Sequence, residues 1–186
     1  MQQERGDGIE SVNRGKSVEE NMKIFEDMLS GANTTFCLRA KLNMQDKNKC
    51  LRDPVLYRCK AEPHHKTGDR YKAYPTYDLA CPIIDSIEGV SHALRTIEYR
   101  DRNPLYDWVQ RTLGLRKVVI YDFGKLNLKS TCLSKRKLRW FVEEGKVEGW
   151  DDPRFPTVQG IMRKGMTVEA LKVYMLEQGP SQNTVN

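Results

Sequence analysis

The sequence has no long apolar run. Its longest segment free of Asp, Glu, Lys and Arg is Met28 to Leu38, only eleven residues, whereas a membrane-spanning helix needs about 18 or more. The first ten residues have neither the apolar core of a secretory signal nor the Arg-rich, acid-poor pattern of a transit peptide. We therefore expect no membrane segment and a cytoplasmic location.

Cysteine and histidine are also scarce. The five cysteines are odd in number and scattered, which favours buried, reduced thiols over a disulfide framework: Cys37, Cys50, Cys59, Cys81 and Cys132. No Cys-x-x-Cys pair is present, so Cys50, Cys59, His64 and His65 do not have zinc-ligand spacing. We expect neither a disulfide nor a protein-bound metal.

What remains is an ordinary globular composition with a basic excess. The chain has 186 residues, 39% of them hydrophobic and 30% charged, which suits one domain or one and a half. Its net charge is +6, and between Asp122 and Glu143 there are six basic residues and no acidic one. A polyanionic partner is one interpretation of this run, and a solvated basic face is the other.

The pattern of apolar and turn-forming residues predicts a mixed fold. Residues 1–16 are polar and aperiodic, and we interpret them as a lead segment. Ser17 and Glu20 form a capping box before a helix with one buried stripe that Gly31 ends. Short extended runs from 36 to 74 predict antiparallel hairpins.

The second half predicts a strand near 89–94, a helix over 104–113 and a strand over 118–121, which together suggest a parallel crossover unit. Three short helices are predicted over 137–144, 158–163 and 168–177, the last capped by Thr167. The fold class is therefore α/β.

The basic run carries a resemblance that is more specific than its charge. Residues 133–137, Leu-Ser-Lys-Arg-Lys, resemble the second signature of the class I aminoacyl-tRNA synthetases, in the Met-Ser-Lys-Arg-Lys form of the glutamyl and glutaminyl branch. From Ser17 onward, almost every part of the chain resembles that branch. The further matching segments, which occur in the same order as in the branch, are 36–41, 52–58, 74–78, 85–90, 125–128 and 149–157.

This resemblance implies a partial class I catalytic domain. It assigns residues 17–75 to the distal part of the insertion that binds the tRNA acceptor end, and 76–147 to the second half of a Rossmann-like domain with the signature loop. Residues 148–186 would begin the helical region that contacts the tRNA stem. The first signature, His-x-Gly-His, is not present in the sequence, so we expect the chain to be truncated at both ends and inactive by itself.

The resemblance also implies the amino acid. In the glutamyl branch an arginine after the Gly-Val segment pairs with the substrate γ-carboxylate, and Arg95 stands at that position. A guanidinium forks onto a carboxylate with two charge-assisted bonds, which a carboxamide cannot accept. Tyr77 resembles the tyrosine that contacts the amino acid. The alternatives are that Arg95 is a surface residue paired with Glu98 or Asp101 and that Tyr77 is a core residue.

The remaining site residues follow from the same resemblance. It implies that Lys135 and Ser134 are catalytic, and that ATP, accompanied by Mg²⁺, is bound by Leu133, Ser134, Lys135, Lys125 and Leu126. Contacts with tRNA(Glu) are expected from Asp101, Arg136 and Lys137.

The expected partners are tRNA(Glu), glutamate, ATP and, as a further candidate, a multi-synthetase complex, with fusion to a prolyl synthetase as one possible context. Two alternatives stay open, a glutaminyl-tRNA synthetase and a non-catalytic tRNA-binding remnant.

Overall fold

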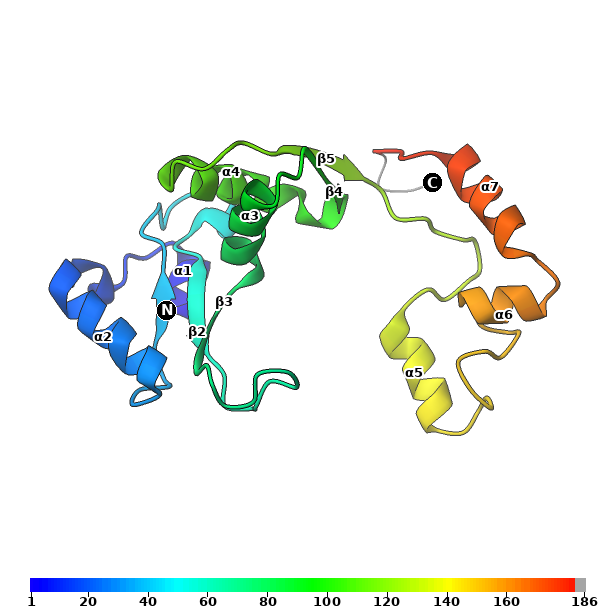
Figure 1. Cartoon of the computed structure of the whole chain (residues 1–186), viewed down its shortest axis with the longest axis horizontal. Coiled ribbons are helices and arrows are strands. Elements are labelled where there is room, and N and C mark those ends of the chain that lie inside the picture. The colour runs from blue at the N-terminus through cyan, green and yellow to red at the C-terminus, as the bar shows by residue number, and fades with distance from the viewer. Residues whose placement is uncertain (183–186) are drawn as a thin grey trace. The chain divides into compact units, whose positions relative to one another are not determined.

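The computed structural model describes residues 1–182 (Figure 1). The chain divides into two compact units. The N-terminal unit comprises residues 1–94 and 98–121, and the C-terminal unit comprises 95–97 and, among the described residues, 122–182. The division after residue 121 falls inside the predicted segment 76–147.

Helices and short strands alternate along the N-terminal unit. In chain order they are α1 (Gln2–Asp7), the 3-10 helix η1 (Val12–Gly15), α2 (Val18–Ser30), β1 (Cys37–Arg39), η2 (Lys49–Leu51), β2 (Val55–Cys59), β3 (Ala73–Pro75), α3 (Tyr77–Ile87), β4 (His92–Thr96), η3 (Ile97–Arg102), α4 (Asn103–Thr112) and β5 (Val119–Phe123), the last residues of β4 and β5 and the first of η3 belonging to the C-terminal unit.

The first sixteen residues, predicted as a polar lead segment, contain α1 and η1 and contact distant parts of the chain. Arg14 Nη1 lies 2.5 Å from Oδ2 of the buried Asp53 carboxylate, and the Arg5 guanidinium donates to the Arg52 carbonyl. Asp53 also accepts from the Leu42 backbone N–H at 2.8 Å and has a φ of +41°. A buried carboxylate requires such partners, so these long-range contacts anchor a polar segment that has no apolar periodicity.

Helix α2 begins with the predicted capping box. The Ser17 side chain accepts from the Glu20 backbone N–H at 3.2 Å, and the Glu20 carboxylate accepts from the Ser17 N–H at 2.7 Å. The periodicity predicts a buried stripe of Val18, Met22, Phe25 and Leu29, and this is wrong for Val18, which is 73% exposed, and for Met22 and Leu29, which are also exposed. Met28, outside that stripe, is buried. One turn of α2 therefore contributes most of its core contact.

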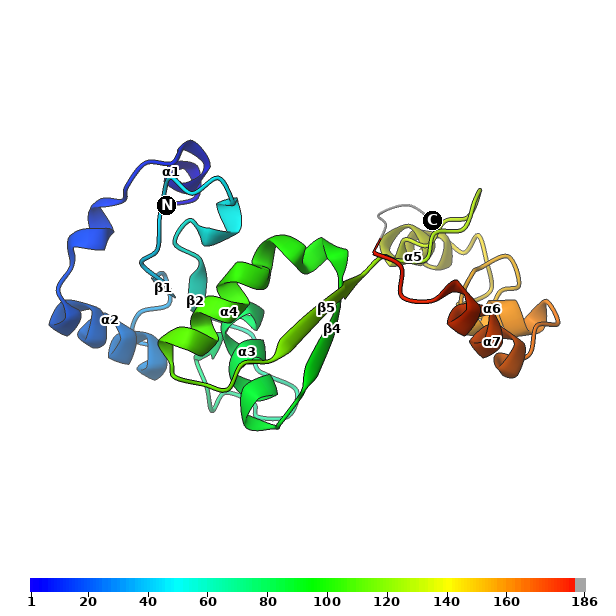
Figure 2. The ribbon, with the colours of Figure 1, turned by 90° about the horizontal axis from the view of Figure 1, so that it is seen from above.

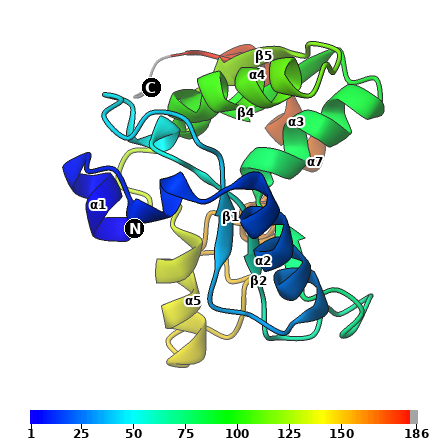
Figure 3. The ribbon, with the colours of Figure 1, turned by 90° about the vertical axis from the view of Figure 1, so that its left-hand side faces the viewer.

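The predicted antiparallel strands are confirmed in the three-stranded sheet of order β1-β2-β3. Leu38 pairs with Tyr57, and Arg58 pairs with Tyr74, with a register shift between Leu38 and Arg39. Figure 3 shows α2 beside β1 and β2, and the Phe25 and Tyr57 rings meet edge to face with centroids 5.1 Å apart.

The packing of α3 on α4 forms the core of this unit. Leu79, Leu105 and Val109 make up its buried apolar cluster. The side chain of Gln110, 1% exposed, donates to the Pro82 carbonyl at 3.0 Å and accepts from the Val118 backbone N–H at 3.1 Å. This amide therefore joins both helices to the segment that leads into β5, and leaves none of those polar groups unpaired in the interior.

The predicted order of strand, helix and strand is confirmed, since β4 and β5 form a two-stranded sheet and α4 lies between them in sequence. The helix predicted over 104–113 is α4. Sequence reasoning assigned no element to residues 77–84, which form the first part of α3 even though Pro82 lies inside that helix. The chain is thus a mixed α/β structure.

Between β5 and residue 182 the chain forms three helices, as predicted: α5 (Lys135–Glu143), α6 (Val158–Arg163) and α7 (Val168–Gln178) (Figure 2). Aromatic rings pack between α5 and the segment before α6, with Phe141 and Phe155 centroids 6.4 Å apart and Trp150 and Phe155 6.3 Å apart. A Cβ on Gly160 would approach the Phe155 carbonyl oxygen to 2.4 Å, so only glycine fits there.

The five cysteines are free thiols, but the prediction that they are buried is wrong. Cys132 is exposed, and the other four are half-buried. Burial raises the pKa of the Cys59 thiol, whose sulfur lies 3.5 Å from the Asn33 carbonyl oxygen.

Acid is expected to weaken the C-terminal unit through Asp152. The Arg154 side chain and backbone N–H both donate to this carboxylate and lower its pKa from 3.8 to about 2. Because the pKa is depressed in the folded state, the stabilisation is present above about pH 4 and is lost as the pH falls towards 2. We expect the unfolding temperature, followed by tryptophan fluorescence, to fall over that interval.

Asp152→Asn is expected to lower the unfolding temperature at neutral pH and to flatten its decline between pH 4 and 2. Asp151→Asn is the matched control, because Asp151 is its exposed neighbour, and should keep the wild-type decline. A decline as steep in Asp152→Asn as in the wild type would contradict this assignment.

Candidate functional site

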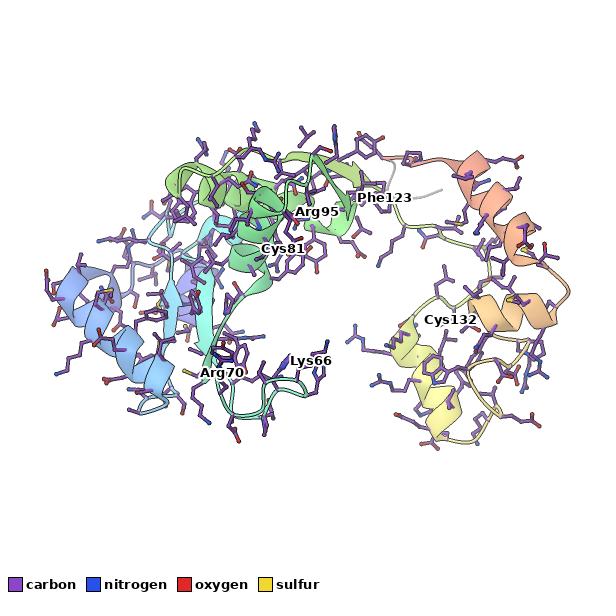
Figure 4. The ribbon with its side chains drawn as sticks, in the orientation of Figure 1. Lys66, Arg70, Cys81, Arg95, Phe123 and Cys132 are labelled. Carbon is purple, nitrogen blue, oxygen red and sulfur yellow. The ribbon has the colours of Figure 1, made fainter. Side chains whose placement is uncertain are left out.

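Arg95 lies at the inward-facing position of β4. Along this strand His92 and Leu94 are exposed, whereas Arg95 is only 8% exposed. Figure 4 labels Arg95 on this part of the ribbon. Arg95 is therefore not a surface residue, and its pairing with Glu98 or Asp101 stays an alternative. Burying a guanidinium is costly unless it meets an anion or acceptors.

Tyr77 occupies the first turn of α3 with its side chain half exposed (51%), so the alternative of a core tyrosine is wrong. Its ring packs against Tyr99 with centroids 5.4 Å apart. The Arg102 guanidinium lies 5.7 Å from the Tyr99 ring centroid and forms an ion pair with Asp78, the residue after Tyr77. These contacts hold the Tyr77 ring in place, while about half of the side chain stays exposed.

Sequence reasoning did not find Tyr99 and Arg102. The available signal was weak, because an aromatic residue and an arginine in an irregular polar stretch have no periodicity. Asp101, between them in η3, is exposed, and its carbonyl accepts from Asn48 Nδ2 at 2.5 Å. This bond ties the backbone at Asp101 to the turn around η2 and leaves the carboxylate exposed.

The signature residues lie at the start of α5 and are all exposed: Leu133, Ser134, Lys135, Arg136 and Lys137. Ser134 is the N-cap residue, but its side chain makes no capping hydrogen bond, and the first turn contains no acidic residue. Cations at a helix N-terminus are unfavourable, because the partial charge there is positive. Leu138, which is buried, anchors this turn to the unit.

An open cavity of about 420 Å³ lies beside Lys135. Its lining comes from one face of α5 and from the segment after it: Lys135, Arg139, Val142, Glu143 and Trp150. Sequence reasoning did not single out Arg139 or Trp150, although Lys135, Arg139 and Glu143 follow the four-residue spacing of one helix face.

Lys125 and Leu126 lie in the irregular segment that follows β5, the first exposed and the second half-buried. The preceding residue is held in place, since the Gly124 backbone N–H donates to the Ser181 carbonyl at 2.6 Å. Tyr77 and Asp101 belong to the N-terminal unit, and the other predicted site residues belong to the C-terminal unit. That both groups meet on one ligand stays a prediction.

The described residues contain neither a metal-binding cluster nor a membrane-spanning helix. Across residues 1–182, nowhere do three or more His, Cys, Asp or Glu side chains gather in a way that could hold a metal ion. In the same part of the chain, none of the helices is long and apolar enough to cross a membrane.

Comparison with known proteins gives one consistent result. The family model described as "tRNA synthetases class I (E and Q), catalytic domain" matches residues 1–186. The cytoplasmic glutamate–tRNA ligases of Arabidopsis thaliana and Saccharomyces cerevisiae are 58% and 57% identical, with 98% and 100% of this chain and 26% and 27% of those proteins covered. The bifunctional glutamate/proline–tRNA ligase of Mus musculus is 55% identical, with 100% of this chain and 12% of that protein covered. The chain thus spans at most about a quarter of these relatives' length.

Proposed function

Because the chain belongs to the catalytic-domain family of the class I tRNA synthetases for glutamate and glutamine, we propose that it is the glutamate-selecting part of a cytoplasmic glutamate–tRNA ligase. The observation that carries the proposal is the burial of Arg95 on β4. An arginine held in the interior selects a carboxylate over a carboxamide, since it offers parallel donors and no acceptor.

Tyr77 and Arg95 bind the amino acid in this proposal. The exposed part of the Tyr77 side chain, backed by Tyr99, contacts the substrate, and the Arg95 guanidinium pairs with the γ-carboxylate. A glutamine side chain would not form the buried ion pair that the glutamate γ-carboxylate forms with Arg95, and the loss of such a pair costs about 3 to 5 kcal/mol. That cost corresponds to a preference of roughly a hundred- to several-thousand-fold.

Lys135, the exposed lysine of the signature, binds the phosphates of ATP in this proposal. In the activation step the glutamate α-carboxylate attacks the α-phosphate of ATP, giving glutamyl-adenylate and pyrophosphate, and the terminal ribose of tRNA(Glu) then takes the glutamyl group. Lys135, supported by Ser134 and Leu133, stabilises charge on the phosphates, and Lys125 and Leu126 lie beside the adenosine. Mg²⁺ enters with ATP. Both steps depend on positioning and electrostatics.

The RNA contacts follow the same scheme. Residues 17–75 form part of the acceptor-binding insertion, 76–147 the second half of the Rossmann-like domain, and 148–186 the start of the stem-contact region. Arg136 and Lys137 contact the RNA backbone, and the Asp101 carboxylate accepts from a base in the wide minor groove. The fused glutamate/proline–tRNA ligases among the relatives suggest a multi-synthetase complex as a further partner.

Binding of two non-hydrolysable analogues tests the proposal. Glutamyl and glutaminyl sulfamoyl adenosine are titrated against the chain and against the full-length gene product. We expect the glutamyl analogue to bind at least about a hundredfold more tightly. A preference for the glutaminyl analogue would assign the chain to the glutamine branch, and tRNA binding without affinity for either analogue would leave a non-catalytic RNA-binding protein.

A further inference from the structure

Asp78 and Arg102 join the beginnings of α3 and α4 in the N-terminal unit. Asp78 is an acidic residue in the first turn of α3, and Arg102 is the N-cap residue of α4. Arg102 Nη1 donates to Asp78 Oδ2 and forms an ion pair with it. The Asp78 side chain is 14% exposed and that of Arg102 is 42% exposed. Water therefore weakens this pair less than it weakens a fully exposed one.

The same guanidinium lies against an aromatic ring. Arg102 Cζ is 5.7 Å from the centroid of the Tyr99 ring, within the distance at which a cation is attracted to an aromatic side chain. Tyr99 in turn packs on Tyr77, with ring centroids 5.4 Å apart and ring planes at 49°. Asp78, Arg102, Tyr99 and Tyr77 therefore form a continuous series of contacts that begins and ends in the first turn of α3.

The backbone that carries Tyr77 is anchored on both sides. The Thr76 hydroxyl and backbone N–H donate to the carbonyls of Val55 and Leu56 on β2, at 2.8 and 2.7 Å. Leu79, two residues after Tyr77, belongs to the buried apolar cluster between α3 and α4. The position of this turn is thus set by β2 and by the core, and the ring orientation is what its neighbours have to fix.

The segment that carries Tyr99 is not anchored by the core, because none of the residues of η3 is buried. Side-chain contacts therefore help to set its position. Asn48 Nδ2 donates to the Asp101 carbonyl at 2.5 Å and so holds the η3 backbone. The Arg102 guanidinium contacts the Tyr99 ring itself and ties it to α3 through Asp78.

A half-exposed aromatic side chain has several orientations available, and a ligand binds the one that fits. The apparent affinity falls in proportion to the fraction of molecules that hold that orientation. We propose that Asp78 and Arg102 are positioning residues for glutamate, which hold Tyr77, through the Tyr99 ring, in the orientation that binds the amino acid. This inference rests on the proposed function, in which Tyr77 contacts the substrate.

Steady-state glutamylation of tRNA(Glu) by the full-length gene product tests the inference. Arg102→Met keeps a long unbranched side chain but removes the charge. It should raise the KM for glutamate about five- to tenfold, the effect expected from losing a partly exposed ion pair and a cation–π contact together. The kcat and the KM values for ATP and tRNA(Glu) should stay within about twofold of the wild type. Arg102→Lys restores the charge and should bring the KM for glutamate back to within about threefold.

A double-mutant cycle shows whether Arg102 acts through Tyr77. In a Tyr77→Ala background the ring to be positioned is absent, so Arg102→Met should raise the KM for glutamate by less than about twofold further. Asp78→Asn should match Arg102→Met, and the two changes together should be no worse than Arg102→Met alone, because they remove the same pair.

The matched control is Arg111→Met. Arg111 Nε lies 3.0 Å from Asp107 Oδ2 in another arginine–aspartate pair of α4, with its side chain 71% exposed. Its loss should leave all the kinetic constants within about twofold of the wild type. Circular dichroism checks that each variant is folded.

The outcomes separate this inference from the proposed function. If Tyr77→Ala raises the KM for glutamate but Arg102→Met behaves like the control, the inference is wrong and the proposed function stands. Equal effects of Arg102→Met with and without the Tyr77 ring would show a general structural role, and a rise in the KM for tRNA(Glu) in place of that for glutamate would show a contact with RNA; either result overturns the inference. An unchanged KM for glutamate in Tyr77→Ala would refute the proposed amino-acid site as well.

Discussion

Replacing Arg95 with alanine is expected to remove the preference for the glutamyl over the glutaminyl adenylate analogue, a loss of roughly a hundred- to several-thousand-fold. The physical reason is that the side chain is buried, at 8% exposure, where the carboxylate and carboxamide differ most in their interaction with a fixed positive charge. An ion pair between an exposed arginine and the glutamate carboxylate would contribute only about 1 kcal/mol or less to binding.

The ratio of the two affinities is the decisive measurement, since general damage to the fold would lower both affinities together. Arg95→Lys keeps the charge but not the two-donor fork, so it should retain an intermediate preference. An unchanged ratio in a folded Arg95→Ala variant would rule out this residue as the reader of the side chain and leave the choice between glutamate and glutamine to another residue.

Replacing Lys135 with alanine is expected to slow glutamate-dependent ATP–pyrophosphate exchange by the full-length gene product about a hundred- to a thousandfold. Loss of one donor to developing transition-state charge typically costs about 2.7 to 4 kcal/mol. Lys135 is the first residue of α5, exposed and set among further cations, so its ammonium is free to follow the phosphates. The KM for glutamate should stay near its wild-type value, because this side chain does not contact the amino acid in the proposed site.

Lys172→Ala is the matched control for this experiment, since Lys172 is an exposed lysine on α7 of the same unit. It should leave the exchange rate unchanged. Equal rates for Lys135→Ala and the control would remove Lys135 from the catalytic step. A rise in the KM for glutamate at constant kcat would instead assign it to substrate binding.

Local rules predicted the regular elements well because each depends on neighbouring residues. The capping box of Ser17 and Glu20 requires only four consecutive residues, and both of its hydrogen bonds are present. The Thr167 cap is equally local, since its side chain accepts from the Ala170 backbone N–H. The α3 helix was not predicted, and it has a proline, Pro82, inside it, a residue that usually ends or kinks a helix; in the structure the Pro82 carbonyl accepts from the Gln110 amide.

Burial was predicted less well, because it depends on what each face meets. Periodicity predicted burial of Val18, Met22 and Leu29, but all three are exposed, whereas Met28 is buried and Phe25 packs on Tyr57 of β2. Residues 1–16 have no periodicity at all, yet Arg14 is fixed by a carboxylate 39 residues away. The local sequence around Arg14 or around Asp53 does not indicate that these two residues form an ion pair.

By itself, the sequence determined the class of the protein and the chemistry of its candidate residues, because residue type and local spacing fix helices, strands, charge and the signature run at 133–137. The tertiary structure decided which of those residues are buried and which are exposed to a ligand. It placed Arg95 in the interior and left Tyr77 and Lys135 open, and it brought Arg102 against Asp78 and the Tyr99 ring. Exposure of a side chain is set by the elements packed around it, which come from distant parts of the chain, so it follows only from the folded whole.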